Sequence, residues 1–324
     1  MRTSRDKDFT LSASPIDYRW NLIPNDDGQM HLIDANPMLG EPEPIFNPET
    51  STVFMLFTRS NPTVAQRISW TQGSLESSNF NPANPVRLLI HGFNSGPGGS
   101  VNIANTAAYI QRGAFNIIVV DWSVGASTPN YNTARNRVPQ VADQVARLLN
   151  FLVSNGWTQW NQINIAGHSL GAHIAGLTGK RTAGRIQKIF AMDPAGPLFA
   201  LDAPNDRFAA TDAVYTEGLR TNSGGMGFHQ PLAQADFYPN WGTVQPGCGI
   251  DLSGQCAHSR AHALFAESIN SNSFVSRRCN NHQEIVNRAC NGAGTAIMGG
   301  EPGNVGLSGI FFLETNSNSP FAQG

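Results

Sequence analysis

A serine lies between two glycines in the segment Gly167-His168-Ser169-Leu170-Gly171. A short apolar run at residues 163–166 precedes this segment, and residues 172–177 have helical character. Strand, turn and helix in this order are typical of a nucleophile elbow, where a strained turn exposes a serine hydroxyl to a histidine base. Because G-x-S-x-G also occurs in ordinary turns of a Gly-rich chain, the other parts of an acyl-transfer site must be found as well.

Asp193 is the candidate for the acid that orients such a base. In enzymes built on a nucleophile elbow, the serine comes first along the chain, then the acid, then the histidine. Asp193 follows Ser169 and comes directly after an apolar run at residues 188–192, so we expect it at the carboxyl end of a strand. The alternative is an Asx turn, which any Asp-Pro pair such as Asp193-Pro194 can form.

Several histidines follow Asp193 and compete for the role of base. His258 lies after Cys256 and before an expected helix at residues 260–269, on a loop that a disulfide would fix. His262 lies one turn further along, where a packed or surface histidine is also expected. Chain order favours His258, but it leaves His262, His282 and, less well placed, His229 as alternatives.

Two backbone amides are candidates for the oxyanion hole. One is the amide of Leu170, the residue after the nucleophile, and the other is that of Phe93, in the loop His91-Gly92-Phe93-Asn94. Loss of one such donor typically costs about 2.7–4 kcal/mol of transition-state stabilisation. We expect His91 to support the loop through a hydrogen bond and assign it no chemical role.

Short apolar runs rich in β-branched residues must position these groups. They alternate with helical patterns, which predicts a mostly parallel sheet covered on both faces, with strands at residues 52–58, 85–91, 116–122, 162–166, 188–192 and 309–315. Apolar spacing predicts a helix over residues 138–153, with Pro139 in its first turn. We expect one α/β domain over residues 1–324, beginning with an irregular segment at 1–50 that holds one edge strand near 30–33.

Composition and cysteine spacing limit the cellular setting. A net charge of −2 argues against a nucleic-acid partner, and no apolar run is long enough to cross a bilayer. Cys248 with Cys256, and Cys279 with Cys290, form two close pairs whose local bonding suits an oxidising compartment. Four cysteines allow three connectivities, and four reduced thiols are the alternative. A zinc site is less favoured, because Cys256 and His258 lack a second ligand pair.

Several motifs together resemble those of the pancreatic-type animal lipases. They occur in the family's order from about residue 50 to the end: LIHGF, DW, GHSLGAH, MDPAGPLF, ADFYPNWG, PGC, CAHSRA and LETNSNSPFA. The resemblance implies an α/β-hydrolase fold and an extracellular esterase of glycerolipids, with no cofactor and with no signal peptide visible in this chain. It also implies a triad of Ser169, Asp193 and His258, with oxyanion amides from Phe93 and Leu170.

Departures from the family pattern narrow the expected substrate. We expect no C-terminal β-sandwich domain like that of the larger members. The loop between Cys248 and Cys256 has seven residues, where triacylglycerol lipases carry a longer lid. Short loops resemble those of the phospholipase A1 branch, which includes insect and venom enzymes. A stapled loop of this length leaves the cleft open to a dispersed phospholipid, so we expect a phospholipid or another glycerolipid as partner, at a membrane or lipid interface.

Other interpretations stay open at this point. A neutral lipase, or a lipid-binding relative such as the yolk storage proteins, would use the same fold, although storage relatives lose the nucleophile that Ser169 provides here. A cytosolic esterase is supported by the missing signal alone. Trp241 replaces a family glycine and either lines the acyl groove, contacts a membrane or packs internally. Residues 202–206 align with a calcium loop but differ from it, so we assign no metal.

Overall fold

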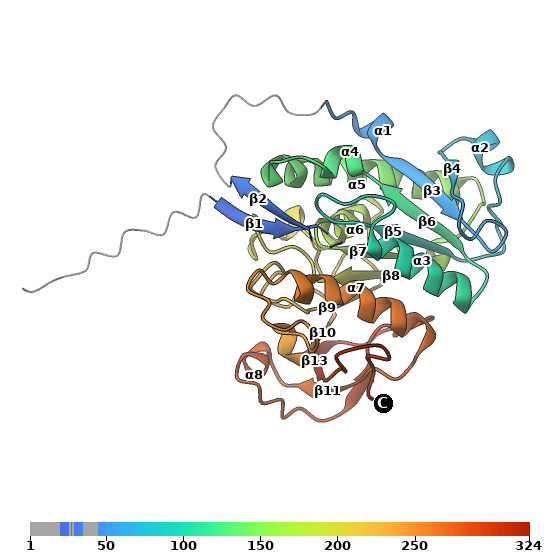
Figure 1. Cartoon of the computed structure of the whole chain (residues 1–324). Coiled ribbons are helices and arrows are strands. Elements are labelled where there is room, and N and C mark those ends of the chain that lie inside the picture. Colours follow the sequence, from blue (N-terminus) through green and yellow to red (C-terminus); the bar gives the residue numbers. More distant parts are fainter. Residues whose placement is uncertain (1–19, 26, 28, 35–44) are drawn as a thin grey trace, which may run out of the picture.

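Eleven strands form one continuous sheet in the computed structural model, which describes residues 20–25, 27, 29–34 and 45–324 (Figure 1). Their order across the sheet is β12-β11-β13-β10-β9-β8-β7-β5-β6-β3-β4. The strands from β13 to β6 are mutually parallel, while β3 and β4 at one edge, and β11 and β12 at the other, run antiparallel to their neighbours. The prediction of a mostly parallel sheet is confirmed.

The apolar runs of the sequence form the expected strands. These are β3 (Val53–Phe57), β5 (Val86–Ile90), β6 (Asn116–Asp121), β7 (Ile163–His168), β8 (Lys188–Met192) and β13 (Gly309–Leu313). Every residue of β5, β7 and β8 is buried, as parallel strands covered on both faces require. Strands without predicted bounds complete the sheet: β4 (Gln66–Ile68), β9 (Tyr215–Leu219), β10 (Ala235–Pro239), β11 (Val275–Cys279) and β12 (Thr295–Ile297).

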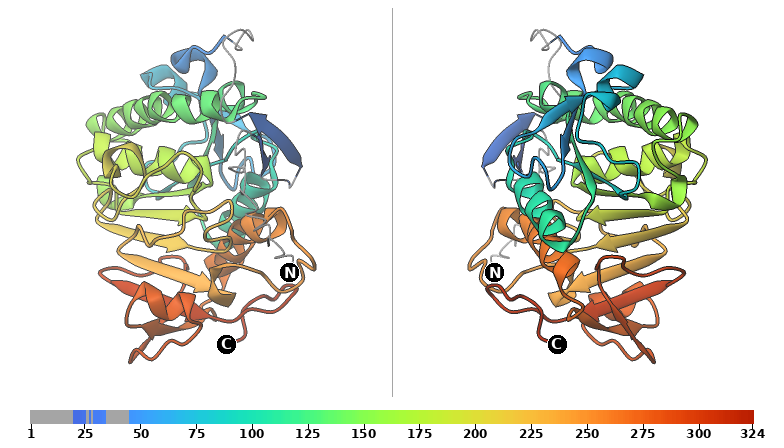
Figure 2. Two further views of the ribbon diagram at one scale, coloured as in Figure 1. Left: turned by 90° about the vertical axis from the view of Figure 1, so that its left-hand side faces the viewer. Right: turned by 90° about the vertical axis from the view of Figure 1, so that its right-hand side faces the viewer.

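Helices cover both faces of the sheet, as the two side views show (Figure 2). Helices α5 (Tyr131–Ser154) and α6 (Leu170–Arg181) pack on one face, and α3 (Ser100–Arg112) and α7 (Gln255–Asn270) on the other. Neighbouring residues of β5 divide between the faces, since Leu88 belongs to the core under α5 and α6, and Leu89 to the core under α3 and α7. Shorter helical turns are α1 (Pro48–Ser51), α2 (Gln72–Glu76), α4 (Ser123–Ala126), α8 (His282–Val286), η1 (Trp160–Gln162), η2 (Pro204–Asp206) and η3 (Asn240–Gly242).

Helix α5 begins seven residues before its predicted start, and Pro139 lies in its interior rather than in its first turn. The side chain of Asn130 caps the helix by accepting a hydrogen bond from the amide of Asn132. Tyr131 and Ala134 are buried and extend the apolar face toward this cap. The prediction of the start was wrong because a proline, which favours the first turn of a helix, also stands within this longer one.

A two-stranded hairpin lies apart from the main sheet. It pairs β1 (Trp20–Pro24) with β2 (Met30–Asp34) in antiparallel register (Figure 1). The strand expected near residues 30–33 is therefore present, but it pairs with β1 and not with the edge of the main sheet. The rest of the predicted irregular segment up to residue 44 lies outside the described residues.

Both close cysteine pairs are disulfides, Cys248–Cys256 and Cys279–Cys290, which is the local connectivity. Cys248–Cys256 closes the loop that leads into α7, and Cys279–Cys290 joins the end of β11 to the segment after α8. No helix among the described residues combines the length and hydropathy of a membrane span.

Candidate active site

Ser169 occupies a strained turn between β7 and α6. Its backbone has φ 56° and ψ −121°, a conformation that non-glycine residues rarely adopt. The glycines on either side permit this turn. A Cβ on Gly167 would lie 2.2 Å from the carbonyl oxygen of Gly171, and one on Gly171 would lie 2.2 Å from that of Ile90. The elbow that the motif predicts is therefore present, with Ser169 at the carboxyl end of a central strand.

Asp193 lies beside Ser169 at the end of the neighbouring strand β8. The amide of Ser169 donates to the carbonyl of Met192 at 3.1 Å, and the amide of Ala195 donates back to the carbonyl of Ser169 at 3.3 Å. The carboxylate of Asp193 is fully buried, and its Oδ1 accepts hydrogen bonds from the amides of Thr221 and Asn222 at 3.0 and 3.1 Å. These two amides hold the second oxygen, Oδ2, toward α7.

His258 contacts that second oxygen. Its Nδ1 lies 2.6 Å from Oδ2 of Asp193, and because the carboxylate accepts, Nδ1 carries the proton. This leaves Nε2 as the basic nitrogen of the neutral ring. His258 is buried, and the pairing joins two residues 65 positions apart in the chain.

His258 lies in the first turn of α7 and not on a loop before it, so the expected position was wrong. The helix begins at Gln255, five residues earlier than the sequence indicated. Gly254 precedes it in the left-handed region, and the carboxylate of Asp251 accepts the amide of Ala257 at 2.8 Å. The capping residue Asp251 lies within the disulfide loop, several residues before the helix. The sequence therefore showed no capping residue directly before the helix start.

His168 supports His258 from the elbow. Its Nε2 donates to the carbonyl oxygen of His258 at 3.1 Å, and the centres of the two rings are 4.6 Å apart. The ring of His262 packs edge-on against that of His168, and its Nε2 lies 3.3 Å from Oγ of Ser100. Among the competing histidines the geometry thus places His258 against Asp193, while His262 flanks the pair. The role of His168 was not anticipated, although it lies within the GHSLG motif.

The loop after β5 lies next to the elbow. Ile90, the last residue of β5, pairs in register with Gly167 of β7, so Phe93 and Leu170 follow two neighbouring strands at the same edge. Both residues are buried. Nε2 of His91 accepts the amide of Trp122 at 3.2 Å, and its Nδ1 donates to the carbonyl of Gly92 at 3.0 Å. His91 therefore supports the loop, in the position that the sequence suggested.

The β1–β2 hairpin also contacts this loop. Nδ2 of Asn25 donates to the carbonyl of Asn94 at 3.2 Å, and Nδ2 of Asn94 donates to Nδ1 of His31 at 2.6 Å. Burial lowers the pKa of His31, which agrees with its role as an acceptor. The ring of His31 packs edge-on against that of Phe93 with centres 6.0 Å apart. No sequence signal indicated this contact, because residues 20–34 carry no recognisable motif.

Exposed apolar side chains lie on loops around the carboxyl ends of the strands. Within the disulfide loop, Ile250 is 89% exposed and Leu252 is 95% exposed. Leu198 and Leu201, after Asp193, and Val244, after β10, are also exposed. Trp241, by contrast, stacks on Phe312 with ring centres 3.7 Å apart, so its ring packs internally.

Comparison with known proteins identifies relatives over most of the chain. The family model described as Lipase matches residues 40–321. Lipase member H-A of Xenopus laevis is 37% identical over 67% of this chain and 48% of its own length. Pancreatic triacylglycerol lipase of Mus musculus is 32% identical over 85% of this chain and 66% of its own length. This chain thus spans about half to two thirds of the length of these curated relatives.

Among solved structures, MGS-M1, an α/β-hydrolase enzyme from a deep-sea metagenome library, is 16% identical with a TM-score of 0.34, covering 64% of this chain and 72% of that one. The parallel sheet, the helices on both of its faces and the elbow after β7 define an α/β-hydrolase fold, in which β13 belongs to the main sheet and not to a separate sandwich. With a family match over residues 40–321, this chain is a member of the lipase family.

Proposed function

We propose that this protein is a serine esterase of glycerolipids, with Ser169 as nucleophile, His258 as base and Asp193 as orienting acid. The hydrogen bond of 2.6 Å between Nδ1 of His258 and Oδ2 of Asp193, beside the strained Ser169, is the observation that carries the proposal. An Asx turn would explain Asp193-Pro194, but it gives no reason for a buried carboxylate that receives two amides and an imidazole.

The proposed reaction follows from this arrangement. Nε2 of His258 takes the proton of the Ser169 hydroxyl as its oxygen attacks the ester carbonyl. The amides of Phe93 and Leu170 stabilise the oxyanion, and the protonated His258 then gives its proton to the leaving alcohol. Water hydrolyses the acyl-enzyme by the same steps. Asp193 orients the ring and stabilises the imidazolium through the hydrogen bond that it accepts from Nδ1.

A lipid surface is the proposed place of action. The exposed apolar residues lie on the loops that follow the carboxyl ends of β8 and β10, and Ser169 and Asp193 follow β7 and β8 at the same edge of the sheet. They are Leu198, Leu201, Val244, Ile250 and Leu252. Exposed apolar side chains grouped around a site mark contact with an apolar partner. Together with the lipase family match, they support a substrate presented by a membrane or a lipid particle.

Within this class we propose phospholipase A1 activity. Only seven residues separate Cys248 from Cys256, and the two apolar side chains of that loop already face solvent. A loop this short lacks the area to cover the cleft until an oil droplet displaces it, so a single phospholipid has access. The two disulfides support secretion, because such bonds persist in oxidising compartments.

Hydrolysis of two substrates in parallel tests the proposal. One is a phosphatidylcholine with palmitate at sn-1 and oleate at sn-2, in vesicles, and the other is an emulsified triacylglycerol. We expect palmitate release from the first at the higher rate, and no release by Ser169→Ala, with Ser273→Ala, at an exposed serine, as the matched control. Preference for the emulsion would indicate a neutral lipase, and activity in Ser169→Ala would refute the triad.

A further inference from the structure

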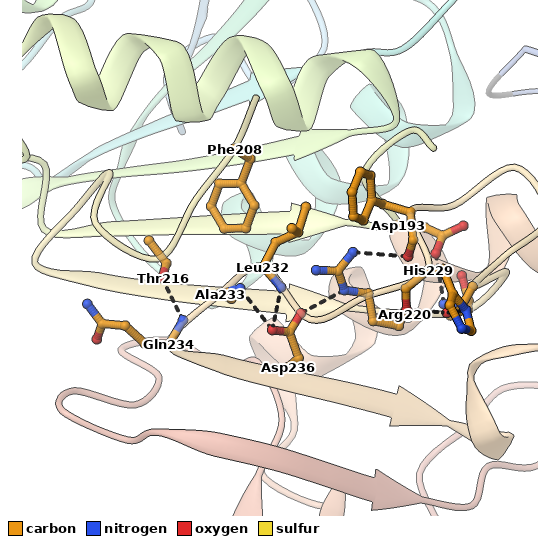
Figure 3. Close-up of polar contacts among 12 residues, drawn as sticks. Asp193, Phe208, Thr216, Arg220, His229, Leu232, Ala233, Gln234 and Asp236 are labelled. Carbon is orange, nitrogen blue, oxygen red and sulfur yellow. Dashed lines mark hydrogen bonds and ion pairs between the residues drawn. The ribbon is translucent and has the colours of Figure 1, made fainter. Parts of the chain in front are cut away.

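A buried ion pair lies directly behind the candidate acid. Arg220, the residue after β9, and Asp236 of β10 are both 0% exposed, and Nε of Arg220 lies 2.6 Å from Oδ1 of Asp236. The other oxygen of Asp236 accepts the amides of Leu232 and Ala233 at 3.0 and 2.8 Å. Figure 3 shows the guanidinium between Asp236 and the segment that holds Asp193.

Arg220 is joined through the backbone to the groups that fix Asp193. The amides that donate to Oδ1 of Asp193 belong to Thr221 and Asn222, the two residues that follow Arg220. Nη1 of Arg220 donates to the carbonyl of Phe228 at 3.4 Å, and the amide of Phe228 donates to the carbonyl of Pro194 at 2.8 Å. Arg220 thus holds both ends of residues 221–228, which we call the acid loop.

The acid loop fits closely around the carboxylate. A Cβ on Gly227 would lie 2.4 Å from Oδ1 of Asp193, and the amide of Gly196 donates to the carbonyl of Met226 at 2.8 Å. Nothing else can enter between loop and acid, so a small shift of residues 221–228 would change the direction of the Asp193 carboxylate and of the His258 ring bonded to it.

The guanidinium also acts through its charge. Burial alone would lower the pKa of Arg220, but Asp236 foremost, with Tyr238 and Asp193, raises it above its usual value. Arg220 therefore stays a cation, and its field reaches the carboxylate of Asp193. The other titratable groups within its field are Arg207, His173 of α6 and His282 of α8. His168 lies against the ring of His258, and His262 packs against His168.

We infer that Arg220, held by Asp236, is a positioning residue for the acid–base pair of Asp193 and His258: it fixes the acid loop and balances the charge of Asp193. This inference rests on the proposed function. Replacement of a buried ion pair by uncharged residues of similar size is often tolerated by a fold, so stability alone gives no reason for this pair beside the acid.

A neutral double variant, Arg220→Met with Asp236→Asn, separates positioning from folding, since it removes both charges of the ion pair together. We expect kcat on a soluble short-chain ester to fall about 10- to 100-fold, the scale of a misplaced catalytic group. KM should stay within about twofold, because the ester does not contact Arg220. Arg87→Met with Glu301→Gln is the matched control. It removes another buried arginine–carboxylate pair, which joins β5 to a distant loop, and should leave kcat unchanged.

The single variants give a signature that a structural role would not produce. Arg220→Met removes the cation and therefore favours the imidazolium of His258. The acidic limb of the profile of kcat/KM against pH should then move to higher pH. In Asp236→Asn the cation is no longer neutralised, so the same limb moves to lower pH. Arg220→Lys, which keeps the charge, should keep the wild-type limb while still losing kcat through the missing fork of hydrogen bonds.

NMR titration of the His258 ring in the same variants gives a readout independent of turnover, with opposite pKa changes expected for Arg220→Met and Asp236→Asn. Wild-type kcat and an unchanged His258 titration in the double and single variants would overturn the inference. If the wild type hydrolyses no ester, the proposed function fails by itself, and the titration still decides whether Arg220 acts on His258.

Discussion

The amide of Phe208 donates a hydrogen bond to Nδ1 of His173 at 3.1 Å. The other ring nitrogen, Nε2, donates to the carbonyl of Ala195 at 2.8 Å. His173 on α6 thus joins the segment after Asp193 to residue 208, and only a neutral ring can make both bonds. Burial, the largest influence, lowers the pKa of His173 to about 3.

This bridge predicts a stability that depends on pH. The pKa of His173 is lower in the folded chain than in the unfolded chain, where it is near 6.5, so the folded state favours the neutral ring. The contribution is complete above about pH 6.5 and is lost toward pH 3, at up to about 1.4 kcal/mol per pH unit. Urea denaturation at pH 7 and pH 5 measures the loss. His173→Gln should show a smaller difference between the two pH values, and an equal difference would contradict the assignment.

Gly167→Ala should abolish activity. The added Cβ meets a backbone carbonyl at 2.2 Å, and backbone at the elbow cannot move without displacing Ser169. We expect a loss of about 100-fold or more in kcat/KM and a destabilisation of about 1–3 kcal/mol. Gly73→Ala in α2 is the control, since its Cβ meets nothing within 4 Å and alanine favours a helix. A Gly167→Ala protein with wild-type activity would show that the elbow tolerates a side chain there.

The two disulfides should differ in their effect on catalysis. Removal of either bond by paired Cys→Ser changes costs about 2.5–3 kcal/mol by the loop-closure model, because the closed loops are similar in length. Cys248–Cys256 closes the loop whose Asp251 caps the helix of His258, so its removal should also lower kcat on a soluble ester. Loss of Cys279–Cys290 should leave kcat unchanged. Chemical denaturation and kinetics of the two variants test this. Equal kcat values would show that the Cys248–Cys256 loop does not position His258.

The sequence predicts the part of the molecule where local pattern and three-dimensional contact agree. The runs that form β5 to β8 are mostly apolar because both faces of the sheet are covered, and Ser169 and Asp193 directly follow β7 and β8. The position of Asp193 after Ser169 and after an apolar run was enough to select it, although its hydrogen-bond partners were not predicted.

What the sequence could not supply depends on distant or backbone contacts. Strand β9 contains the buried Glu217. Its carboxylate accepts hydrogen bonds from the hydroxyl of Tyr215 and from the amide of Gly299, which lies 82 residues further along the chain. A charged residue in a short run gives no strand signal when its partner is that remote. The amides of Thr221 and Asn222, which hold the acid, belong to the backbone and therefore leave no trace in residue type.

Activity on vesicles should depend on the exposed residues of the disulfide loop. Ile250→Ser with Leu252→Ser removes two solvent-facing apolar side chains, so we expect weaker binding to vesicles and slower phospholipid hydrolysis. Hydrolysis of a soluble ester should not change. Val64→Ser, at an exposed residue between β3 and β4, is the control for lost surface hydrophobicity. Equal vesicle binding by the wild type, the double variant and Val64→Ser would show that this loop does not contact the lipid.

The hairpin of β1 and β2 precedes the region that the family model matches, which begins at residue 40. Asn25 and His31 nevertheless contact Asn94 and Phe93. A chimera that transplants residues 40–321 would carry every shared motif but leave the loop of Phe93 without this backing. Two lipases that agree at all of their motifs can therefore differ in how firmly this loop is held, and the difference would be encoded in a segment that family similarity does not cover.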